Sequence, residues 1–335
     1  MSSLPVSILL PFLDAETTLR AAIDSIVAQR FSAWELFLID NASTDGSTLI
    51  AHEQARRDVR IRVLDEPRKG IAFALNTGLA EAQGRYIARM DADDIAHPER
   101  LQQQVEYLEA HPEIGVLGTA TRFTSTMNES RGMQAFVQWQ NELLTPHQHY
   151  VKRFVDAPLA HPTVLFRREL VERHGGYDTG PVPEDHELWL RWMHAGVRFA
   201  KLPEPLLTWT DHPQRLSRTH ANYSAEAFFT TKTKWIAAWI QRKYAGSRPV
   251  IIAGTSALCQ ERARLLTEHG VPIQAFTDVS GKAVPGRAFI PHTELPGAGQ
   301  AMVVSFISQR GTGGRIAAFL SSRGLVEGED FILAA

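Results

Sequence analysis

Three carboxylates stand within four residues at Asp91-Ala-Asp-Asp94, directly after the apolar segment Tyr86-Ile-Ala-Arg-Met90. Carboxylates this close repel one another unless a cation or hydrogen-bond donors compensate their charge. A divalent cation such as Mg²⁺ or Mn²⁺ would do so, and its other ligands are typically water and substrate phosphates. The alternative is an ordinary capped turn before Pro98, because aspartate is common in turns. The cluster is therefore a candidate metal site.

Three further groups of residues have types that suit a phosphate-bearing ligand and a proton acceptor. Asp40-Asn41 can bond a base or ribose edge, although an Asx-turn entering a helix has the same sequence. Arg68-Lys69 can neutralise phosphate charge, although a basic pair is often only a solvated loop. Glu184 and Asp185 follow Pro183 at a predicted helix N-terminus, where the helix dipole favours an ionised carboxylate. Such a carboxylate can take a proton from a hydroxyl, and an ordinary N-cap is the alternative.

The elements that must position these residues alternate between strand and helix. Apolar runs predict strands at 6–10, 35–39, 61–64 and 86–90, and helical spacing predicts helices between them and from Pro98 onward. This alternation predicts a mainly parallel α/β sheet with helices on both faces. Ligands of such sheets bind outside the carboxyl ends of the strands. Asp40-Asn41, Arg68-Lys69 and the acidic cluster all follow strand ends, so we expect one shared site.

The sequence pattern changes near residue 246, where a new series of strand, helix and strand begins. We predict a first domain over 1–228, a basic linker helix over 229–247 and a small Rossmann-like α/β domain over 248–335. Gly254-Thr-Ser-Ala-Leu-Cys259 lacks two glycines of the dinucleotide-binding pattern G-x-G-x-x-G, although Asp278 stands where a ribose-binding acid would lie. A structural or assembly role is therefore favoured over dinucleotide binding.

The predicted linker helix is basic and carries two tryptophans. Residues 230–248 contain five Lys or Arg and no acid, and Trp235 and Trp239 lie one turn apart. Such a segment can dock on an anionic membrane surface. Alternatively, the tryptophans pack between two domains.

The composition excludes several classes of protein. A chain of 335 residues with 44% hydrophobic residues can form about two folded domains. The net charge of −2 gives no overall attraction to nucleic acid. The single cysteine, Cys259, can form no internal disulfide. Residues 1–5 contain no basic residue and no apolar run reaches membrane-spanning length, so we expect neither a leader nor a membrane span. We expect a cytoplasmic protein, with peripheral contact at the inner face of the membrane if the basic helix docks there.

Successive motifs over residues 4 to 220 resemble those of family 2 glycosyltransferases with the GT-A fold. The blocks are Val6-Ser-Ile-Leu-Leu-Pro11, Asp40-Asn-Ala-Ser-Thr-Asp-Gly46, Asn76-Thr-Gly78, Gly84-Arg-Tyr-Ile-Ala-Arg-Met-Asp-Ala-Asp-Asp94, Pro98-Glu-Arg-Leu101 and Glu184-Asp-His-Glu-Leu-Trp189. One Asp-x-Asp is weak evidence, but these blocks stand in family order and spacing.

The resemblance implies a metal-dependent, inverting transfer of a sugar from a nucleotide-diphosphate donor, expected to be a UDP-sugar, to a glycan or lipid-linked glycan. It makes Asp185 the general base and puts His161 and Glu184 on the acceptor side. It assigns Mn²⁺ or Mg²⁺ to Asp93, Asp94 and His212. It places the donor against Pro11, Leu13, Asp40, Asn41, Arg68, Lys69, Asp91, Ala92 and Arg215. Surface polysaccharide or lipopolysaccharide assembly is the implied setting.

The chain departs from the family pattern beside the expected base pocket. Leu13 stands where an aromatic residue is usual, Asp14 where Asn is common, and Asn41 where a second Asp is frequent. These differences weaken the case for uridine but not for sugar transfer.

Two alternatives to catalytic sugar transfer remain. A nucleotidyltransferase should carry a Gly- and Arg-rich loop after the first strand, which Pro11-Phe-Leu-Asp-Ala-Glu16 does not offer. A non-catalytic glycan-assembly partner would not need Asp91, Asp93 and Asp185 together. The sequence does not specify the donor sugar, the acceptor or the oligomeric state.

Overall fold

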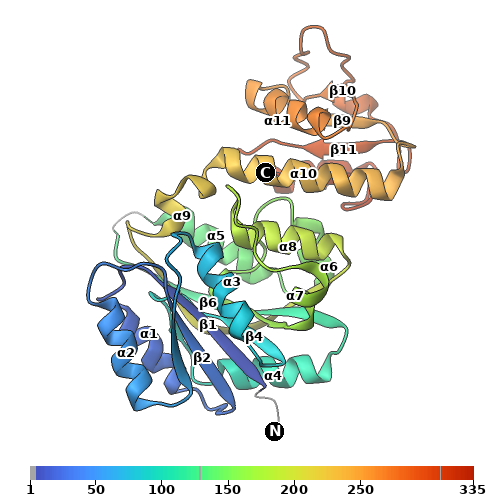
Figure 1. Ribbon diagram of the computed structural model, residues 1–335. Helices are drawn as coiled ribbons and strands as arrows, with labels where there is room; N and C mark the ends of the chain where they lie inside the picture. Colours follow the sequence, from blue (N-terminus) through green and yellow to red (C-terminus); the bar gives the residue numbers. More distant parts are fainter. Residues whose placement is uncertain (1–4, 128–129, 310) are drawn as a thin grey trace. The chain divides into compact units, whose positions relative to one another are not determined.

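The computed structural model describes residues 5–127, 130–309 and 311–335, and the chain divides into two compact units. The first unit comprises Met1–His149 and Pro158–His220, and the second comprises Tyr150–Ala157 and Ala221–Ala335. The units therefore meet in sequence at His220, and a short segment from the middle of the chain belongs to the second unit (Figure 1).

The first unit is built on one sheet whose strand order is β3-β2-β1-β4-β7-β6-β8-β5. Its strands are β1 (Val6–Phe12), β2 (Trp34–Asp40), β3 (Ile61–Asp65), β4 (Tyr86–Arg89), β5 (Ile95–Ala96), β6 (Ile114–Ser125), β7 (Leu165–Arg167) and β8 (Arg198–Asp211). The strands β3, β2, β1 and β4 are parallel, which confirms the predicted α/β alternation. Beyond them, β7 runs antiparallel to both β4 and β6.

Helices cover both faces of this sheet. They are α1 (Leu19–Val27), α2 (Ser47–Arg57), α3 (Ile71–Glu81), α4 (Arg100–Ala110), α5 (Arg131–Glu142), α6 (Pro146–Lys152), α7 (Glu169–His174), α8 (Glu184–His194) and α9 (Leu216–Thr219), with the short 3-10 turn η1 at His161–Thr163. The apolar stripes of α1 and α4 join Ile8 and Leu10 of β1 in one buried cluster. On the opposite face Gly78 of α3 lies against Leu9 and Ile39, where any larger side chain would collide. The strand β1 is thus covered on both sides, which explains its continuous apolar sequence.

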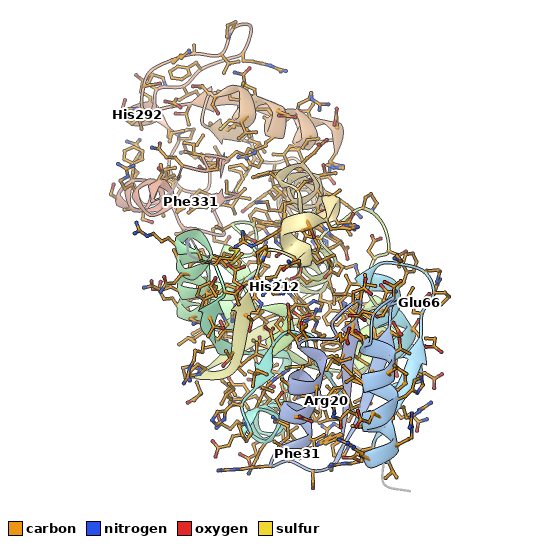
Figure 2. All side chains as sticks on the ribbon, turned by 90° about the vertical axis from the view of Figure 1, so that its left-hand side faces the viewer. Arg20, Phe31, Glu66, His212, His292 and Phe331 are labelled. Carbon is orange, nitrogen blue, oxygen red and sulfur yellow. The ribbon has the colours of Figure 1, made fainter. Side chains whose placement is uncertain are left out.

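Polar side chains lie near the carboxyl ends of the parallel strands. Figure 2 shows His212 after β8 and Glu66 after β3 toward one end of the first unit, and Phe31, which precedes β2, toward the other. This is the edge at which a ligand of an α/β sheet is expected.

The second unit has a parallel sheet of its own, with strand order β10-β9-β11-β12. Its elements are η2 (Ala221–Tyr223), α10 (Ala225–Tyr244), β9 (Val250–Ala253), α11 (Ala257–Glu268), β10 (Ile273–Thr277), η3 (His292–Glu294), β11 (Met302–Ser305), α12 (Thr312–Ser322) and β12 (Phe331–Leu333). The sheet has the predicted Rossmann-like pattern.

The predicted basic linker forms most of α10. Two of its side chains, Lys232 and Trp239, make contacts inside the second unit. Lys232 is buried and donates from Nζ to the carbonyl oxygens of Val155 (3.2 Å) and Ala334 (2.9 Å). Trp239 is also buried and donates from Nε1 to the hydroxyl of Tyr150 at 2.9 Å. These contacts favour packing over membrane docking for both residues. No helix in the described ranges has the length and apolarity to cross a membrane.

The segment Tyr150–Ala157 is integrated in the core of this unit. Lys152 pairs with Glu327 at 2.7 Å, Val155 packs against the cluster around Val303, and Phe154 packs against Trp239. The chain returns to the first unit at Pro158. His161, in η1, therefore follows this segment by only a few residues but belongs to the first unit.

Candidate active site

The acidic cluster lies just past the end of β4, a strand that pairs with β1 on one side and with the antiparallel β7 on the other. Asp91, Asp93 and Asp94 each offer one carboxylate oxygen, and these oxygens lie within 4.8 Å of one another. The strand β4 ends at Arg89, so the turn that follows it is what brings the three carboxylates together.

Each carboxylate is held differently. Asp91 forms an ion pair with the buried Arg89, and Asp93 lies 2.7 Å from Nε2 of His212. Burial lowers the pKa of Arg89, but the charge of Asp91, the hydrogen bond to Asp91 and the charges of Tyr177 and Glu184 together raise it above its usual range. Asp94 is fully buried and accepts a bond on Oδ1 from the backbone N–H of Thr210 at 2.9 Å.

The second oxygen of Asp94, Oδ2, is buried without a hydrogen-bond partner among the described residues. Burial, followed by the charges of Asp91 and Asp93, raises the pKa of Asp94 well above its usual range. A buried carboxylate oxygen without a partner is costly, and oxygen ligands are those that Mg²⁺ and Mn²⁺ prefer. The residues present therefore fit a hard divalent cation.

A buried arginine of α4, Arg100, contacts the strand that precedes the acidic cluster. Arg100 donates from Nη2 to the carbonyl oxygen of Arg89 at 2.7 Å and from Nε to Gln104. Gln104 in turn donates to the carbonyl oxygens of Leu117 (3.0 Å) and Thr163 (2.8 Å). Burial, with the nearby charge of Arg89, lowers the pKa of Arg100 to about 9. The arginine thus joins α4 to the end of the strand that carries the acidic turn.

On the expected donor side, Asp40 and Asn41 are engaged by the protein itself. Asp40 accepts bonds from the N–H of Ser43 (2.8 Å) and the hydroxyl of Thr48 (2.5 Å). Asn41 donates to the carbonyl oxygens of Glu66 and Arg68 and accepts from the N–H of Gly70 at 2.8 Å. Both amide hydrogens of Asn41 are therefore used to hold the 66–70 loop. In the same region Pro11 is buried in β1, and Leu13 is 41% exposed.

The basic pair lies on the loop that Asn41 holds. Arg68 binds Glu66 through both Nε (2.8 Å) and Nη2 (2.6 Å), while Lys69 is exposed. Hydrogen bonds from Arg68 and then Thr77 lower the pKa of Glu66 to about 2. Glu66 therefore compensates much of the charge of Arg68, and Lys69 is the residue of the pair more available to a phosphate.

The segment after β8 brings two further residues to the acidic cluster. His212 contacts Asp93, and Arg215 donates from Nη1 to the carbonyl oxygen of Thr210 at 2.8 Å. The guanidinium of Arg215 lies over the ring of Trp209, 4.1 Å from its centroid. Its charge also opposes the rise in the pKa of Asp94, so it lies within electrostatic range of the cluster.

The acceptor-side residues form a buried network. His161 bonds the hydroxyl of Tyr177 through Nε2 at 2.8 Å, and its Nδ1 lies 3.7 Å from Glu184. Burial, with the charge of Arg89, lowers the pKa of His161 well below its usual range. Burial raises the pKa of Tyr177, and the charges of Glu184, Asp185 and Asp91 add to this effect. Tyr177 thus lies within electrostatic range of both Asp185 and the acidic cluster.

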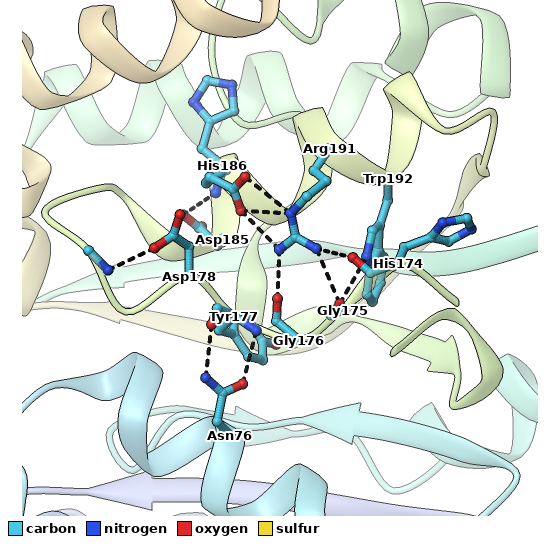
Figure 3. Close-up of polar contacts among 12 residues, drawn as sticks. Asn76, His174, Gly175, Gly176, Tyr177, Asp178, Asp185, His186, Arg191 and Trp192 are labelled. Carbon is cyan, nitrogen blue, oxygen red and sulfur yellow. Dashed lines mark hydrogen bonds and ion pairs between the residues drawn. The ribbon is translucent and has the colours of Figure 1, made fainter. Parts of the chain in front are cut away.

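The helix α8, which begins with Glu184 and Asp185, is anchored at several points to the loop before it (Figure 3). Arg191 binds Glu187 and the carbonyl oxygen of Gly176 (2.6 Å). Asn76 of α3 donates to the carbonyl oxygen of Tyr177 at 2.8 Å and accepts from its N–H at 2.9 Å. Asp185 is half-buried and accepts from the N–H of His186. The loop before α8 is therefore held by Arg191 of α8 and Asn76 of α3.

A family model described as "Glycosyl transferase family 2" matches residues 7–175, just over half of the chain. The chain belongs to glycosyl transferase family 2. This identification confirms the resemblance that the motifs indicated.

Two relatives extend this result. The glycosyltransferase is 31% identical over 190 residues to "Amylovoran biosynthesis glycosyltransferase AmsE" of Erwinia amylovora, covering 56% of this chain and 69% of the relative. It is 28% identical over 226 residues to "O-antigen biosynthesis glycosyltransferase WbnJ" of Escherichia coli, covering 63% and 84%.

Solved structures confirm the GT-A fold of this glycosyltransferase. S. aureus TarS 1-349 in complex with UDP matches with a TM-score of 0.55 and 16% identity, over 79% of this chain and 70% of that one. The mannosyltransferase PcManGT of Pyrobaculum calidifontis, in complex with GDP-Man and Mn²⁺, matches with a TM-score of 0.51 and 19% identity, over 79% and 68%.

Four residues that position the site were missed as candidates. Arg89 and Arg100 are buried cations, and arginine in a sequence usually indicates surface. Asn76 and Arg100 stand inside the motif blocks Asn76-Thr-Gly78 and Pro98-Glu-Arg-Leu101, which was the only signal for them. No pattern indicated Tyr177, because its partners come from distant parts of the chain.

Proposed function

We propose that this glycosyltransferase moves a sugar from a nucleoside diphosphate to a hydroxyl of a glycan or lipid-linked glycan, with inversion and with Mn²⁺ or Mg²⁺. The main support is the group of three carboxylates after β4, in which Oδ2 of Asp94 has no partner among the described residues. A cation bound there would neutralise negative charge on the diphosphate leaving group. Asp91, Asp93 and Asp94 are the residues that would hold it, with His212 beside Asp93.

The cationic side chains would assist departure of the diphosphate. Charge on the leaving oxygen increases as the glycosidic bond breaks, so a fixed cation stabilises the transition state more than the ground state. Arg215 contacts Thr210 and Trp209, and Lys69 is an exposed cation on the loop after β3, so these two side chains are the proposed cations. Asn41 acts indirectly, by holding that loop.

Asp185 is the proposed general base. It is half-buried at the N-terminus of α8, where the helix dipole favours its ionised form. It would take the proton of the acceptor hydroxyl as that oxygen attacks the anomeric carbon from the face opposite the diphosphate. One displacement of this kind inverts the anomeric centre. His161 and Glu184 lie beside Tyr177 and would shape the acceptor side.

The setting and the donor are proposed from the relatives. WbnJ and AmsE are named for O-antigen and amylovoran biosynthesis, which supports a role in assembly of a surface polysaccharide. Solved TarS structures contain UDP and UDP-GlcNAc, and PcManGT contains GDP-Man. We retain a UDP-sugar as the first donor to test and a cytoplasmic location as part of the proposal. We do not extend it to membrane docking, since Lys232 and Trp239 are buried.

The test is a donor panel of UDP- and GDP-sugars with a hydroxyl acceptor, measured with Mn²⁺ and with EDTA. We expect release of nucleoside diphosphate, loss of release in EDTA, recovery with Mn²⁺, and a product of opposite anomeric configuration by NMR. Release of pyrophosphate would instead indicate a nucleotidyltransferase. Full activity in EDTA would refute the metal-dependent part of the proposal.

A further inference from the structure

The loop that follows β8 carries two of the side chains that face the acidic cluster. His212 lies 2.7 Å from Asp93, and Arg215 donates to the carbonyl oxygen of Thr210 at 2.8 Å. The same Thr210 donates its N–H to Asp94 at 2.9 Å. The course of this loop therefore decides where Arg215 lies relative to the three carboxylates.

Apolar burial contributes little to holding the loop. Every residue from 213 to 220 is exposed, except the half-buried Arg215. The short helix α9 buries none of its residues. Burial of apolar surface is the main force that holds most elements of a folded chain in place. Since it is small here, polar contacts must hold this loop instead.

One polar contact joins the two ends of the loop. Arg218 donates from Nε and Nη2 to the two carboxylate oxygens of Asp211, at 3.0 and 2.7 Å. Asp211 is fully buried at the end of β8, and its carbonyl oxygen accepts from the N–H of Thr126 at 3.0 Å. Two-point contacts between arginine and carboxylate fix direction as well as distance. We call the ion pair of Asp211 and Arg218 the clasp.

The clasp does not depend on a ligand. Arg215 is expected to turn toward a phosphate, and a side chain that does so gives up part of its present contact with the protein. Arg218 keeps its contact with Asp211, because breaking it would leave a buried carboxylate without its counter-charge. The chain leaves the first unit after His220, so the clasp also holds the last residues of that unit.

We propose that Arg218 is a positioning residue for the diphosphate of the donor, and that it acts through Arg215. This inference rests on the proposed function, since it takes the diphosphate to be the group that Arg215 meets. Arg218 binds Asp211 through Nε and Nη2, and it is not proposed to touch the diphosphate itself. The clasp keeps the backbone of the loop in place while Arg215 binds.

Tryptic cleavage of the full chain tests the clasp without any ligand. Arg218→Gln loses the two-point contact, so the bond between Arg215 and Leu216 should be cleaved about tenfold faster. The rate of this cleavage is followed by mass spectrometry.

Arg60→Gln is the matched control. Arg60 binds Asp58 through the same two nitrogens, Nε and Nη2, and its side chain has the same 33% exposure as that of Arg218. It stands directly before β3, at the opposite edge of the sheet from the acidic cluster. Its loss should therefore leave cleavage after Arg215 unchanged.

The second measurement is the preference for diphosphate over monophosphate. UDP and UMP, and GDP and GMP, are titrated into the full chain with Mn²⁺ in a calorimeter. Arg218→Gln should reduce the ratio of diphosphate to monophosphate affinity about tenfold, the effect of losing one hydrogen bond to a charged group. A merely structural role for the clasp would lower the melting temperature and leave this ratio unchanged.

A double-mutant cycle separates positioning from direct contact. Arg215→Ala alone should also weaken binding of the diphosphate about tenfold. If Arg218 acts through Arg215, adding Arg218→Gln to this variant should weaken binding by no more than about threefold. Independent effects would multiply to about 100-fold and would overturn the proposal.

Two further outcomes are decisive. Cleavage after Arg215 that is equally fast in Arg218→Gln and Arg60→Gln would overturn the proposal. If Arg218→Gln does not fold, the same measurements on Arg218→Lys decide, because lysine keeps the charge beside Asp211 but not the two-point contact. A wild-type chain that binds diphosphate no better than monophosphate would refute the proposed function, and the cleavage rates would still decide whether the clasp holds the loop.

Discussion

The contact between Asn76 and the loop before α8 offers a quantitative test of how the proposed base is positioned. Asn76→Ala removes two hydrogen bonds, at 2.8 and 2.9 Å, to the backbone of the buried Tyr177. A buried backbone group left without a partner costs about 1–3 kcal/mol, so the two together predict a loss of about 2–6 kcal/mol in unfolding free energy. Because Asp185 follows this loop, activity should fall as well.

A second variant reaches the same contact from the other side. A Cβ on Gly176 would lie 2.6 Å from Oδ1 of Asn76, too close to be tolerated, so Gly176→Ala must displace one of the two. In Gly132→Ala, the matched control, the new Cβ meets nothing within 4 Å. It lies inside α5 and should not destabilise the chain.

The assay combines urea unfolding with steady-state kinetics. We expect Asn76→Ala and Gly176→Ala to lower stability and kcat together, with the KM for the donor changing little, since the lost bonds join Asn76 to the backbone of Tyr177 and not to the proposed donor residues. Wild-type kcat in Asn76→Ala, at the reduced stability, would refute the idea that this contact positions α8. Equal effects of Gly132→Ala and Gly176→Ala would refute the steric argument.

Three other predictions follow from the site and its surroundings. Asp185→Asn should reduce kcat about 10²- to 10⁴-fold while donor binding is retained, and an unchanged transfer rate would rule out Asp185 as the base. Asp93→Ala should weaken Mn²⁺-dependent donor binding in a calorimetric titration, and equal affinity with and without Mn²⁺ in the wild-type chain would contradict the metal assignment. Burial lowers the pKa of Lys201 to about 7 from 10.5. The unfolded chain then binds the extra proton between these values, so the contribution of Lys201 to stability should rise by about 2–3 kcal/mol from pH 7 to pH 9 and stay level below pH 7. Lys201→Met should flatten that rise in urea titrations, and an identical slope in both chains would exclude Lys201 as its source.

Local patterns in the sequence predicted the elements that carry the site. The strands β1, β2 and β4 are buried along their whole length, so each is a continuous apolar run in the sequence. Such runs and their ends can be recognised without knowledge of the fold. Because parallel strands end at one edge, the position of the acidic cluster followed directly.

The parts that could not be predicted depend on contacts distant in sequence. Arg100 bonds the backbone of β4, and Asn76 bonds a loop a hundred residues away. Asn41 follows β2, and its hydrogen bonds hold the neighbouring 66–70 loop, a contact that the residue type did not indicate. Local residue type does not distinguish a side chain that binds a ligand from one that supports the backbone beside it.

The segment Tyr150–Ala157 has a consequence for how this enzyme can be divided. A chain cut after residue 228 would lose the partners of Lys152, Phe154 and Val155, and would expose apolar side chains that the second unit now covers. Such a fragment should aggregate even if its sheet is intact. A chimaera that exchanges the second unit must therefore exchange two separate stretches of sequence. A substitution in one stretch must preserve its packing against the other. We therefore expect the two stretches to have changed together during evolution.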